Sequence, residues 1–322
     1  MASKKKKVIK KDLHILKKYD HDIILISVPL ILLVIFAILS QVSSYVQESV
    51  KREQIVKESQ TFKITDYGYF LKPIEPAISA QSAIIIDSNS KVITYAKNPS
   101  LRFSMASTTK IMSSLVALDY FKPLDVLTVY RSNVEGVNVG FEVGEQLYFE
   151  DVLYAMMLPS GNDAAYIIAD NYPGGIDGFI AAMNKKTEEL YMPNTRYADP
   201  AGLNDDGNFT TVNDLARLAS FAITQPKLAE VMGTRSRFIM NIPRTKSYQL
   251  ENLNRLLGVY GVIAGKTGYT EGAGGVLVTH SIINGHSYIV VVMKSDDRFA
   301  DTETLLSYIS KDTLYFSPEI FK

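Results

Sequence analysis

The chain has 322 residues, enough for one large domain or two modest ones, and 47% of them are hydrophobic, so disorder is not expected. It contains no cysteine, which excludes disulfide frameworks, thiolate zinc sites and cysteine nucleophiles. The formal net charge is zero, yet residues 1–22 hold eight lysines, and the rest of the chain carries 26 basic and 31 acidic residues. A body with this acidic excess has no basic stripe for a phosphate backbone, so nucleic acid is not an expected partner.

The N-terminal region has the pattern of a membrane anchor. No charged residue occurs in Ile23–Gln47, and Ile23–Leu39 is apolar apart from Ser27 and Pro29. Because lysines precede this run, the positive-inside rule keeps the N-terminus in the cytoplasm and exports the rest. A cleaved signal peptide is the alternative, and it also places the body outside the cytoplasm. We therefore expect a single-pass protein of the cell membrane with a basic cytoplasmic tail (1–22), a transmembrane signal-anchor (23–42), a juxtamembrane stalk or linker (43–76) and an extracytoplasmic catalytic domain (77–322).

The exported part begins with strands and continues with helices. A short apolar run over 83–87, a turn over 88–90 and an alternating run over 91–96 predict a β-hairpin. A helix is expected over 107–120, and apolar residues recur with helical period over 149–158, 163–171, 178–190 and 211–223. Thr211 and Asp214 form a capping-box-like start for the last of these.

From residue 262 onward the apolar period changes to two. Residues 275–283 and 287–294 flank Asn284-Gly285, a strong hairpin signal, and 301–309 closes the pattern as a helix. Strands at both ends with helices between them predict an α+β fold, in which an antiparallel sheet is assembled from both ends of the domain and covered by a helical middle.

Histidine does not supply the general base that a Ser-His-Asp site would need. Only four histidines exist; His14 and His21 lie before the predicted anchor, whereas His280 and His286 flank a predicted turn. No H-E-x-x-H or comparable spacing is present, so we expect neither a metal nor another cofactor.

A different base is available in the run Ser107-Thr108-Thr109-Lys110. At helical spacing, residues i and i+3 share a face, so the Lys110 amine lies one turn from the Ser107 hydroxyl. S-x-x-K also occurs at Ser3 and Ser88, but only the match at Ser107 opens an apolar-periodic segment. To act as a base Lys110 must lose its proton, which requires its pKa to fall by about 3 units, equivalent to roughly 4 kcal/mol. Burial or a neighbouring positive charge such as Lys266 can produce such a shift.

Two further motifs occur once each, in the order known for penicillin-recognising serine enzymes. They are Ser160-Gly161-Asn162, which alone could be a simple helix cap, and Lys266-Thr267-Gly268, which alone could be a strand ending in a glycine turn. With the stretches Met183–Leu203 and Leu256–Gly275, the sequence over about residues 80–309 resembles the serine-type D-Ala-D-Ala carboxypeptidases. These are the low-molecular-mass penicillin-binding proteins of the β-lactamase/transpeptidase-like fold.

The resemblance implies roles for individual residues. Ser107 would be the nucleophile and Lys110 the acylation base, while Ser160 and Asn162 would relay protons and orient the substrate amide. The backbone N–H groups of Ser107 and Tyr269 would form the oxyanion hole. The substrate would be a peptidoglycan stem peptide ending in D-Ala-D-Ala, and β-lactam antibiotics would be covalent inhibitors. The residues expected to bind substrate are Lys266, Thr267, Gly268, Tyr269 and Arg298.

The sequence departs from the family pattern at Gly275, where an aromatic residue is common, and in its N-terminal anchor. A D,D-endopeptidase that cuts cross-links remains an alternative because its motifs are the same. A β-lactamase is less favoured because the E-x-x-L-N loop for deacylation is missing. A non-enzymatic binder of wall peptides is the remaining alternative, and the intact motifs argue against it.

Overall fold

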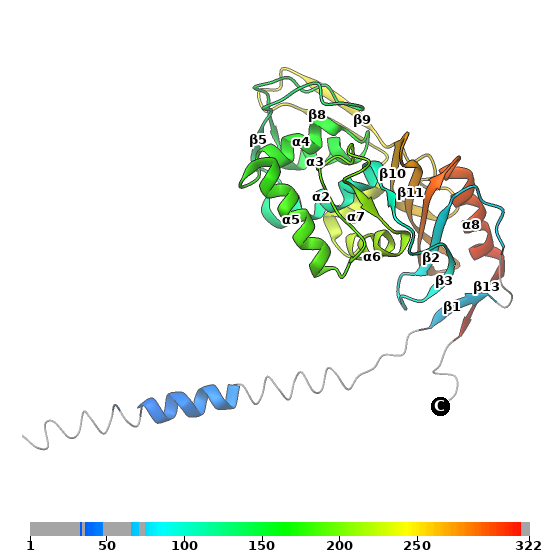
Figure 1. Cartoon of the computed structure of the whole chain (residues 1–322). Helices are drawn as coiled ribbons and strands as arrows, with labels where there is room; N and C mark the ends of the chain where they lie inside the picture. The colour runs from blue at the N-terminus through cyan, green and yellow to red at the C-terminus, as the bar shows by residue number, and fades with distance from the viewer. Residues whose placement is uncertain (1–32, 34–35, 48–65, 71–74, 317–322) are drawn as a thin grey trace, which may run out of the picture. The chain divides into compact units, whose positions relative to one another are not determined.

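A computed structural model describes residues 33, 36–47, 66–70 and 75–316. The chain divides into two units, residues 1–64 and residues 65–322. In the first unit, Phe36–Gln47 is helical (Figure 1). Among the described residues no helix has both the length and the apolar character needed to cross a bilayer. The predicted cytoplasmic tail, most of the predicted anchor and residues 48–65 of the predicted linker lie outside the described residues.

The second unit is built on a five-stranded antiparallel sheet with strand order β10-β11-β12-β2-β3. The central strands β2, β11 and β12 are rich in buried β-branched residues, as expected for strands covered on both faces. The two predicted hairpins are both present, one formed by β2 and β3 and one by β11 and β12. The sheet strands are β2 (Ser82–Asp87), β3 (Ile93–Lys97), β10 (Val262–Thr270), β11 (Gly274–Ile283) and β12 (His286–Ser295).

The described helices of the second unit lie between β3 and β10 in the sequence, except for one at the C-terminal end. The Thr211 hydroxyl accepts a hydrogen bond from the N–H of Asp214 at 3.1 Å, as the capping box predicts. The helical elements are the 3₁₀ helix η1 (Ala106–Thr108), α2 (Thr109–Tyr120), α3 (Phe149–Met157), α4 (Asn162–Asp170), α5 (Gly175–Glu189), α6 (Val212–Ala222), α7 (Pro226–Gly233) and α8 (Arg298–Asp312).

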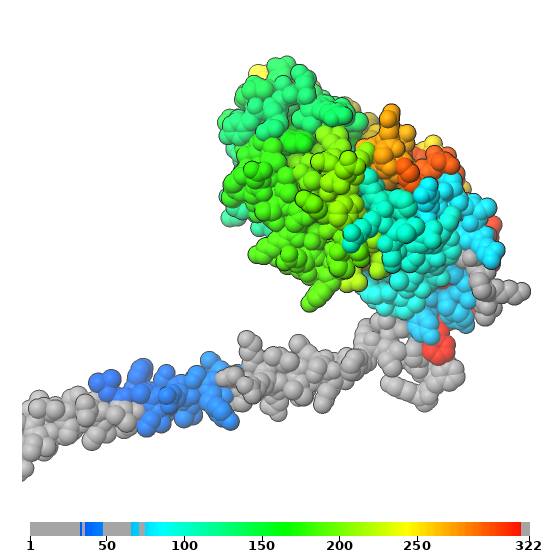
Figure 2. Space-filling model, in the orientation of Figure 1, coloured from blue at the N-terminus to red at the C-terminus, as the bar shows by residue number. Residues whose placement is uncertain are grey.

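Helices cover both faces of the sheet, so two hydrophobic cores form. On one face α8 contributes Leu305, Leu306 and Ile309, which pack against residues of β11, β12 and β2. On the other face the larger core joins the sheet to α2 and its surrounding helices. Figures 1 and 2 show these green helical segments packed beside the cyan and orange strands. Residues 109–117 of α2 are buried on every side, so the helix that follows Ser107 is held rigidly.

Several elements were not predicted from the sequence. They are α7 and four two-stranded sheets: β1 (Tyr67–Phe70) with β13 (Thr313–Phe316), β4 (Phe103–Ser104) with β7 (Phe209–Thr210), β5 (Val126–Thr128) with β6 (Gln146–Tyr148), and β8 (Ser236–Met240) with β9 (Ser247–Glu251). β1 lies within the predicted linker and pairs with the strand that follows α8. The start and the end of the second unit are therefore joined.

Candidate active site

Ser107 lies at a tightly constrained turn that leads into α2. The preceding residue, Ala106, has a φ of 45°, a left-handed conformation that costs energy for a residue with a side chain. A Cβ on Gly268 of β10 would lie only 3.2 Å from the Ser107 backbone nitrogen. Glycine at this position therefore allows β10 to approach the backbone of Ser107, as the K-T-G motif requires.

Lys110 lies one turn into the helical segment and is fully buried. Its Nζ lies 2.9 Å from Ser107 Oγ, 2.7 Å from Asn162 Oδ1 and 2.8 Å from the carbonyl oxygen of Ala201. The amide and carbonyl oxygens can only accept hydrogen bonds, so they take the two N–H groups of a neutral amine. The lone pair then faces Ser107, whose hydroxyl is the only one of the three partners that can donate a proton. This is the geometry of a base beside its alcohol.

Burial lowers the pKa of Lys110 from 10.5 to about 7, because a charged amine loses its hydration there. The negative charges of Asp199 and Asp163 oppose this effect and raise the pKa. Of the two causes expected from the sequence, burial and a neighbouring positive charge, burial is the dominant one. At neutral pH a large fraction of Lys110 is therefore unprotonated.

The second motif places Ser160 and Asn162 at the start of α4. Ser160 has a φ of 66°, and its hydroxyl accepts a hydrogen bond from Nζ of Lys266 at 2.9 Å. Asn162 bonds Lys110 through Oδ1 and donates from Nδ2 to the carbonyl of Glu135 at 2.6 Å. Burial, followed by the charges of Lys110 and Arg298, holds the pKa of Lys266 well below its usual range. The three motifs thus meet at one site.

The carbonyl that contacts Lys110 is held by a loop whose role the sequence analysis did not identify. The carboxylate of Asp199 accepts hydrogen bonds from four successive backbone N–H groups, those of residues 201–204, at 2.6–3.2 Å. This turn fixes the Ala201 carbonyl toward Lys110. The loop belongs to the stretch Met183–Leu203 that carries the family resemblance, and its run Asp199-Pro200-Ala201-Gly202 has a composition typical of a turn built around an aspartate side chain.

Thr267 and Tyr269 lie beside Lys266 on β10, where Thr267 is buried and the Tyr269 side chain is exposed. Tyr269 lies opposite Gly275 in the register of β10 and β11. A Cβ on Gly275 would lie 2.7 Å from the Ser295 carbonyl oxygen and 3.2 Å from Cβ of Arg298. Gly275 has no side chain where related proteins often have an aromatic one, so the start of α8 can pack closely against β11.

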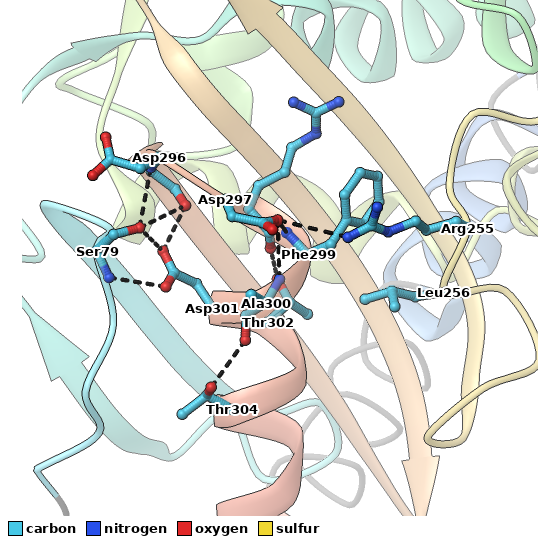
Figure 3. Close-up of polar contacts among 12 residues, drawn as sticks. Ser79, Arg255, Leu256, Asp296, Asp297, Phe299, Ala300, Asp301, Thr302 and Thr304 are labelled. Carbon is cyan, nitrogen blue, oxygen red and sulfur yellow. Dashed lines mark hydrogen bonds and ion pairs between the residues drawn. The ribbon is translucent and has the colours of Figure 1, made fainter.

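Arg298 is the first residue of α8, and its Nε is buried without a hydrogen-bond partner in the structure. Burial lowers the pKa of Arg298, whereas the charge of Asp297 raises it. The free Nε–H of this half-buried guanidinium can donate to an anionic ligand. The helix start is held by Asp297, which caps the N–H groups of Phe299 and Ala300. Figure 3 shows this cap beside the buried carboxylate of Asp301.

Asp301 fixes the base of this helix to two other segments. It accepts hydrogen bonds from Ser79 N at 2.9 Å and Ser79 Oγ at 2.8 Å (Figure 3). It also accepts hydrogen bonds from Ala80 N at 2.7 Å and Ser295 Oγ at 2.5 Å. Because Asp301 is one turn after Arg298, these bonds also fix the backbone that carries the arginine. Among the described residues, no group of three or more acidic or histidine side chains is arranged to hold a metal ion.

The chain is similar to a known protein family and to several of its members. The model of the D-alanyl-D-alanine carboxypeptidase family matches residues 71–297. The D-alanyl-D-alanine endopeptidase of Pseudomonas aeruginosa is 33% identical over 246 residues, covering 74% of this chain and 79% of that protein. The D-alanyl-D-alanine carboxypeptidase DacF of Bacillus subtilis is 30% identical over 227 residues, covering 68% of this chain and 58% of that protein.

Among solved structures, that of the Streptomyces K15 DD-transpeptidase is similar, with a TM-score of 0.69 and 28% identity, covering 73% of this chain and 98% of that one. This likeness confirms the expected transpeptidase-like fold of mixed helices and strands. The family match spans most of the chain, so the chain belongs to the D-alanyl-D-alanine carboxypeptidase family of serine-type peptidases, as the sequence resemblance predicted.

Proposed function

We propose that this enzyme removes the terminal D-alanine from peptidoglycan stem peptides through an acyl-enzyme on Ser107. The observation that carries the proposal is the buried Lys110 amine, 2.9 Å from Ser107 Oγ and with a pKa near 7. A neutral amine in this position can take the hydroxyl proton as Ser107 attacks, which is the task of a general base.

The reaction proceeds in two steps. Ser107 Oγ attacks the carbonyl carbon of the penultimate D-alanine, its proton passes to Lys110, and the oxyanion binds the N–H groups of Ser107 and Tyr269. The C–N bond then breaks as the proton held by Lys110 is returned to the leaving amine through the Ser160 hydroxyl, which contacts Lys266, so Lys110 is neutral again. In the second step water attacks the ester carbonyl and Lys110 accepts its proton. The ester C–O bond then breaks, Lys110 gives this proton to Ser107 Oγ, and the free hydroxyl is regenerated.

The carboxylate of the terminal D-alanine binds on the β10 side of the site. Arg298 supplies a half-buried guanidinium there, Thr267 adds a hydroxyl, and the Lys266 amine, which donates a hydrogen bond to Ser160, adds further N–H groups. The backbone of Gly268 and Tyr269 lies along the edge strand β10, where an extended peptide can add main-chain hydrogen bonds. β-Lactam antibiotics carry a carboxylate next to a reactive amide, so they acylate Ser107 in the same way.

A D,D-endopeptidase activity on peptide cross-links is the second candidate. The relative from Pseudomonas aeruginosa, at 33% identity, is named as an endopeptidase. Both activities break a bond after a D-alanine and need the same nucleophile. They differ in the leaving group, which is a single D-alanine in one case and a cross-linked peptide in the other.

We also propose the domain organisation and location that the sequence indicates. The support is the uncharged apolar run beginning at Ile23 and the lysines before it. Residues 23–42 would anchor the protein in the cell membrane, with residues 1–22 in the cytoplasm and 43–76 linking the anchor to the catalytic domain (77–322). The catalytic domain would then face the peptidoglycan outside the cytoplasm.

Labelling with a fluorescent penicillin tests the nucleophile. The full-length protein in detergent should be labelled covalently, and Ser107→Ala should abolish labelling. Ser88→Ala, which removes the serine of a second S-x-x-K run, is the matched control and should be labelled like wild type. Persistent labelling of Ser107→Ala would exclude the assignment. Comparing D-alanine release from a pentapeptide with cleavage of a cross-linked dimer then separates carboxypeptidase from endopeptidase.

A further inference from the structure

Asp205 joins two segments on either side of the proposed oxyanion hole. Its Oδ1 accepts hydrogen bonds from the hydroxyls of Ser104 and Thr270, each at 2.6 Å. Its Oδ2 accepts a third hydrogen bond, at 3.2 Å, from the N–H of Gly272. One partly buried carboxylate therefore ties β4 to the hairpin formed by β10 and β11.

The two hydroxyls lie very close, along the chain, to the backbone groups that would bind the oxyanion. Ser104 is three residues before Ser107, and Thr270 directly follows Tyr269. The Thr270 hydroxyl also accepts a hydrogen bond from the N–H of Ala273 at 3.0 Å, so the tip of the hairpin is part of the same network. Movement of Ser104 would therefore shift the N–H group of Ser107 through a short stretch of backbone. Movement of Thr270 would shift the N–H group of Tyr269 in the same way.

The turn between β10 and β11 leaves room for the carboxylate of Asp205. A Cβ on Gly272 would lie 2.4 Å from Asp205 Oδ2, so any side chain at Gly272 would displace the carboxylate. Among the described residues, no hydrogen bond runs directly between residues 103–109 and residues 262–270. At Gly268 these segments meet only by close packing, which brings the backbones together without a directional bond. The polar link at this end of β10 is therefore Asp205, whereas Ser160 and Asn162 bridge Lys266 to Lys110 deeper in the site.

We propose that Asp205 is a positioning residue that sets the separation of the Ser107 and Tyr269 N–H groups. The inference rests on the proposed function, because it takes these two groups as the oxyanion hole. Asp205 touches neither substrate nor nucleophile in this role. Oxyanion donors act only when they lie within hydrogen-bond reach of the position where the negative charge develops, so a small change in their separation weakens the transition state more than the bound substrate.

The test is Asp205→Ala in the full-length protein. We expect the rate constant for acylation by benzylpenicillin, and kcat on a D-Ala-D-Ala peptide, to fall by about 10- to 100-fold, the range for a displaced catalytic group. KM should change little. Affinity for a peptide boronic acid, whose boron bonds Ser107 Oγ and places a hydroxyl in the oxyanion hole, should fall by the same factor as kcat. The acid limb of the pH–rate profile should stay near pH 7, because Lys110 is not altered.

Two variants separate positioning from a general loss of structure. Asp205→Asn keeps an oxygen that can accept from Ser104 and Thr270, so it should restore most of the lost rate. Asp206→Ala changes the exposed neighbouring aspartate, for which the structure shows no side-chain partner, and should behave like wild type. If Asp205→Ala proves unstable, Thr270→Val removes one arm of the link and should give a smaller loss of the same kind.

The experiments distinguish a wrong role for Asp205 from a wrong assignment of Ser107 as the nucleophile. If Ser107→Ala abolishes labelling while Asp205→Ala retains wild-type kcat and boronate affinity, the function stands and the positioning role is wrong. A rise in KM with unchanged kcat, or a shift in the acid limb, would also overturn the role. Continued labelling of Ser107→Ala would instead remove the oxyanion hole on which the inference depends.

Discussion

The pKa of Lys110 predicts how acylation depends on pH. The base is active only when unprotonated, and burial places its pKa at about 7. Below that value the neutral fraction falls tenfold for each pH unit, so about 1% remains at pH 5. We therefore expect the second-order rate constant for acylation by benzylpenicillin to be about 100-fold lower at pH 5 than on its plateau above pH 8, with half of the plateau reached near pH 7.

Stopped-flow mixing with excess benzylpenicillin measures this step without deacylation. The carboxylate of benzylpenicillin stays ionised throughout this pH range, so the profile reports groups of the protein. The unfolding transition should be recorded at each pH, because a loss of folded protein in acid would imitate a loss of base. A rate constant that falls only near pH 4 to 5 would indicate a carboxylate base. A rate constant that stays the same from pH 5 to 8 would show that no proton is lost from Lys110 in this range. Either result would refute the assignment of Lys110.

Three further predictions concern stability and binding. The pKa of Lys110 is lower in the folded than in the unfolded state, so its destabilising effect is complete below pH 7 and is relieved as the pH rises toward 10.5. In urea unfolding, the stability of wild type relative to Lys110→Met should therefore rise by about 2 kcal/mol between pH 7 and pH 9. Arg298→Ala should lower kcat/KM by about 100-fold for peptides with a free terminal carboxylate, but much less for amidated peptides, since a hydrogen bond to a charged group contributes about 1.5–3 kcal/mol. Asp301→Ala should lower the free energy of unfolding by about 2–4 kcal/mol because several buried donors lose their acceptor, whereas exposed Asp312→Ala on the same helix should have little effect.

Much of the fold follows from local signals in the sequence. The Asn284-Gly285 turn and the capping box at Thr211 act over a few residues, and both elements form where predicted. The β8–β9 hairpin was missed although β9 alternates between polar and apolar residues, because its partner β8 places three apolar residues, Phe238 to Met240, in succession, and only Ile239 among them is buried. The pairing of β1 with β13 joins segments more than 240 residues apart in the chain, so no local sequence pattern predicts it.

The candidate site likewise contains some residues that local sequence motifs predict and others that only the tertiary structure reveals. The motifs at Ser107, Ser160 and Lys266 predicted side chains that the structure brings into one hydrogen-bonded site. The Ala201 carbonyl could not be predicted, because a backbone group carries no residue-specific signal. Asp205 is one of two adjacent aspartates, and only the tertiary structure distinguishes the one that receives three hydrogen bonds from its exposed neighbour.

Two buried lysines share the site, and we expect their coupling to let a bound substrate change the pKa of the base. Lys110 and Lys266 repel each other when both are protonated, and both pKa values are lowered by burial. An arriving carboxylate beside Lys266 and Arg298 favours protonated Lys266, and this positive charge then lowers the pKa of Lys110 further. The acid limb for the bound complex should consequently lie at lower pH than the limb for the free enzyme. The profile of the limiting acylation rate reports the complex, and that of the second-order constant reports the free enzyme. Coincident limbs would show that the two lysines titrate independently.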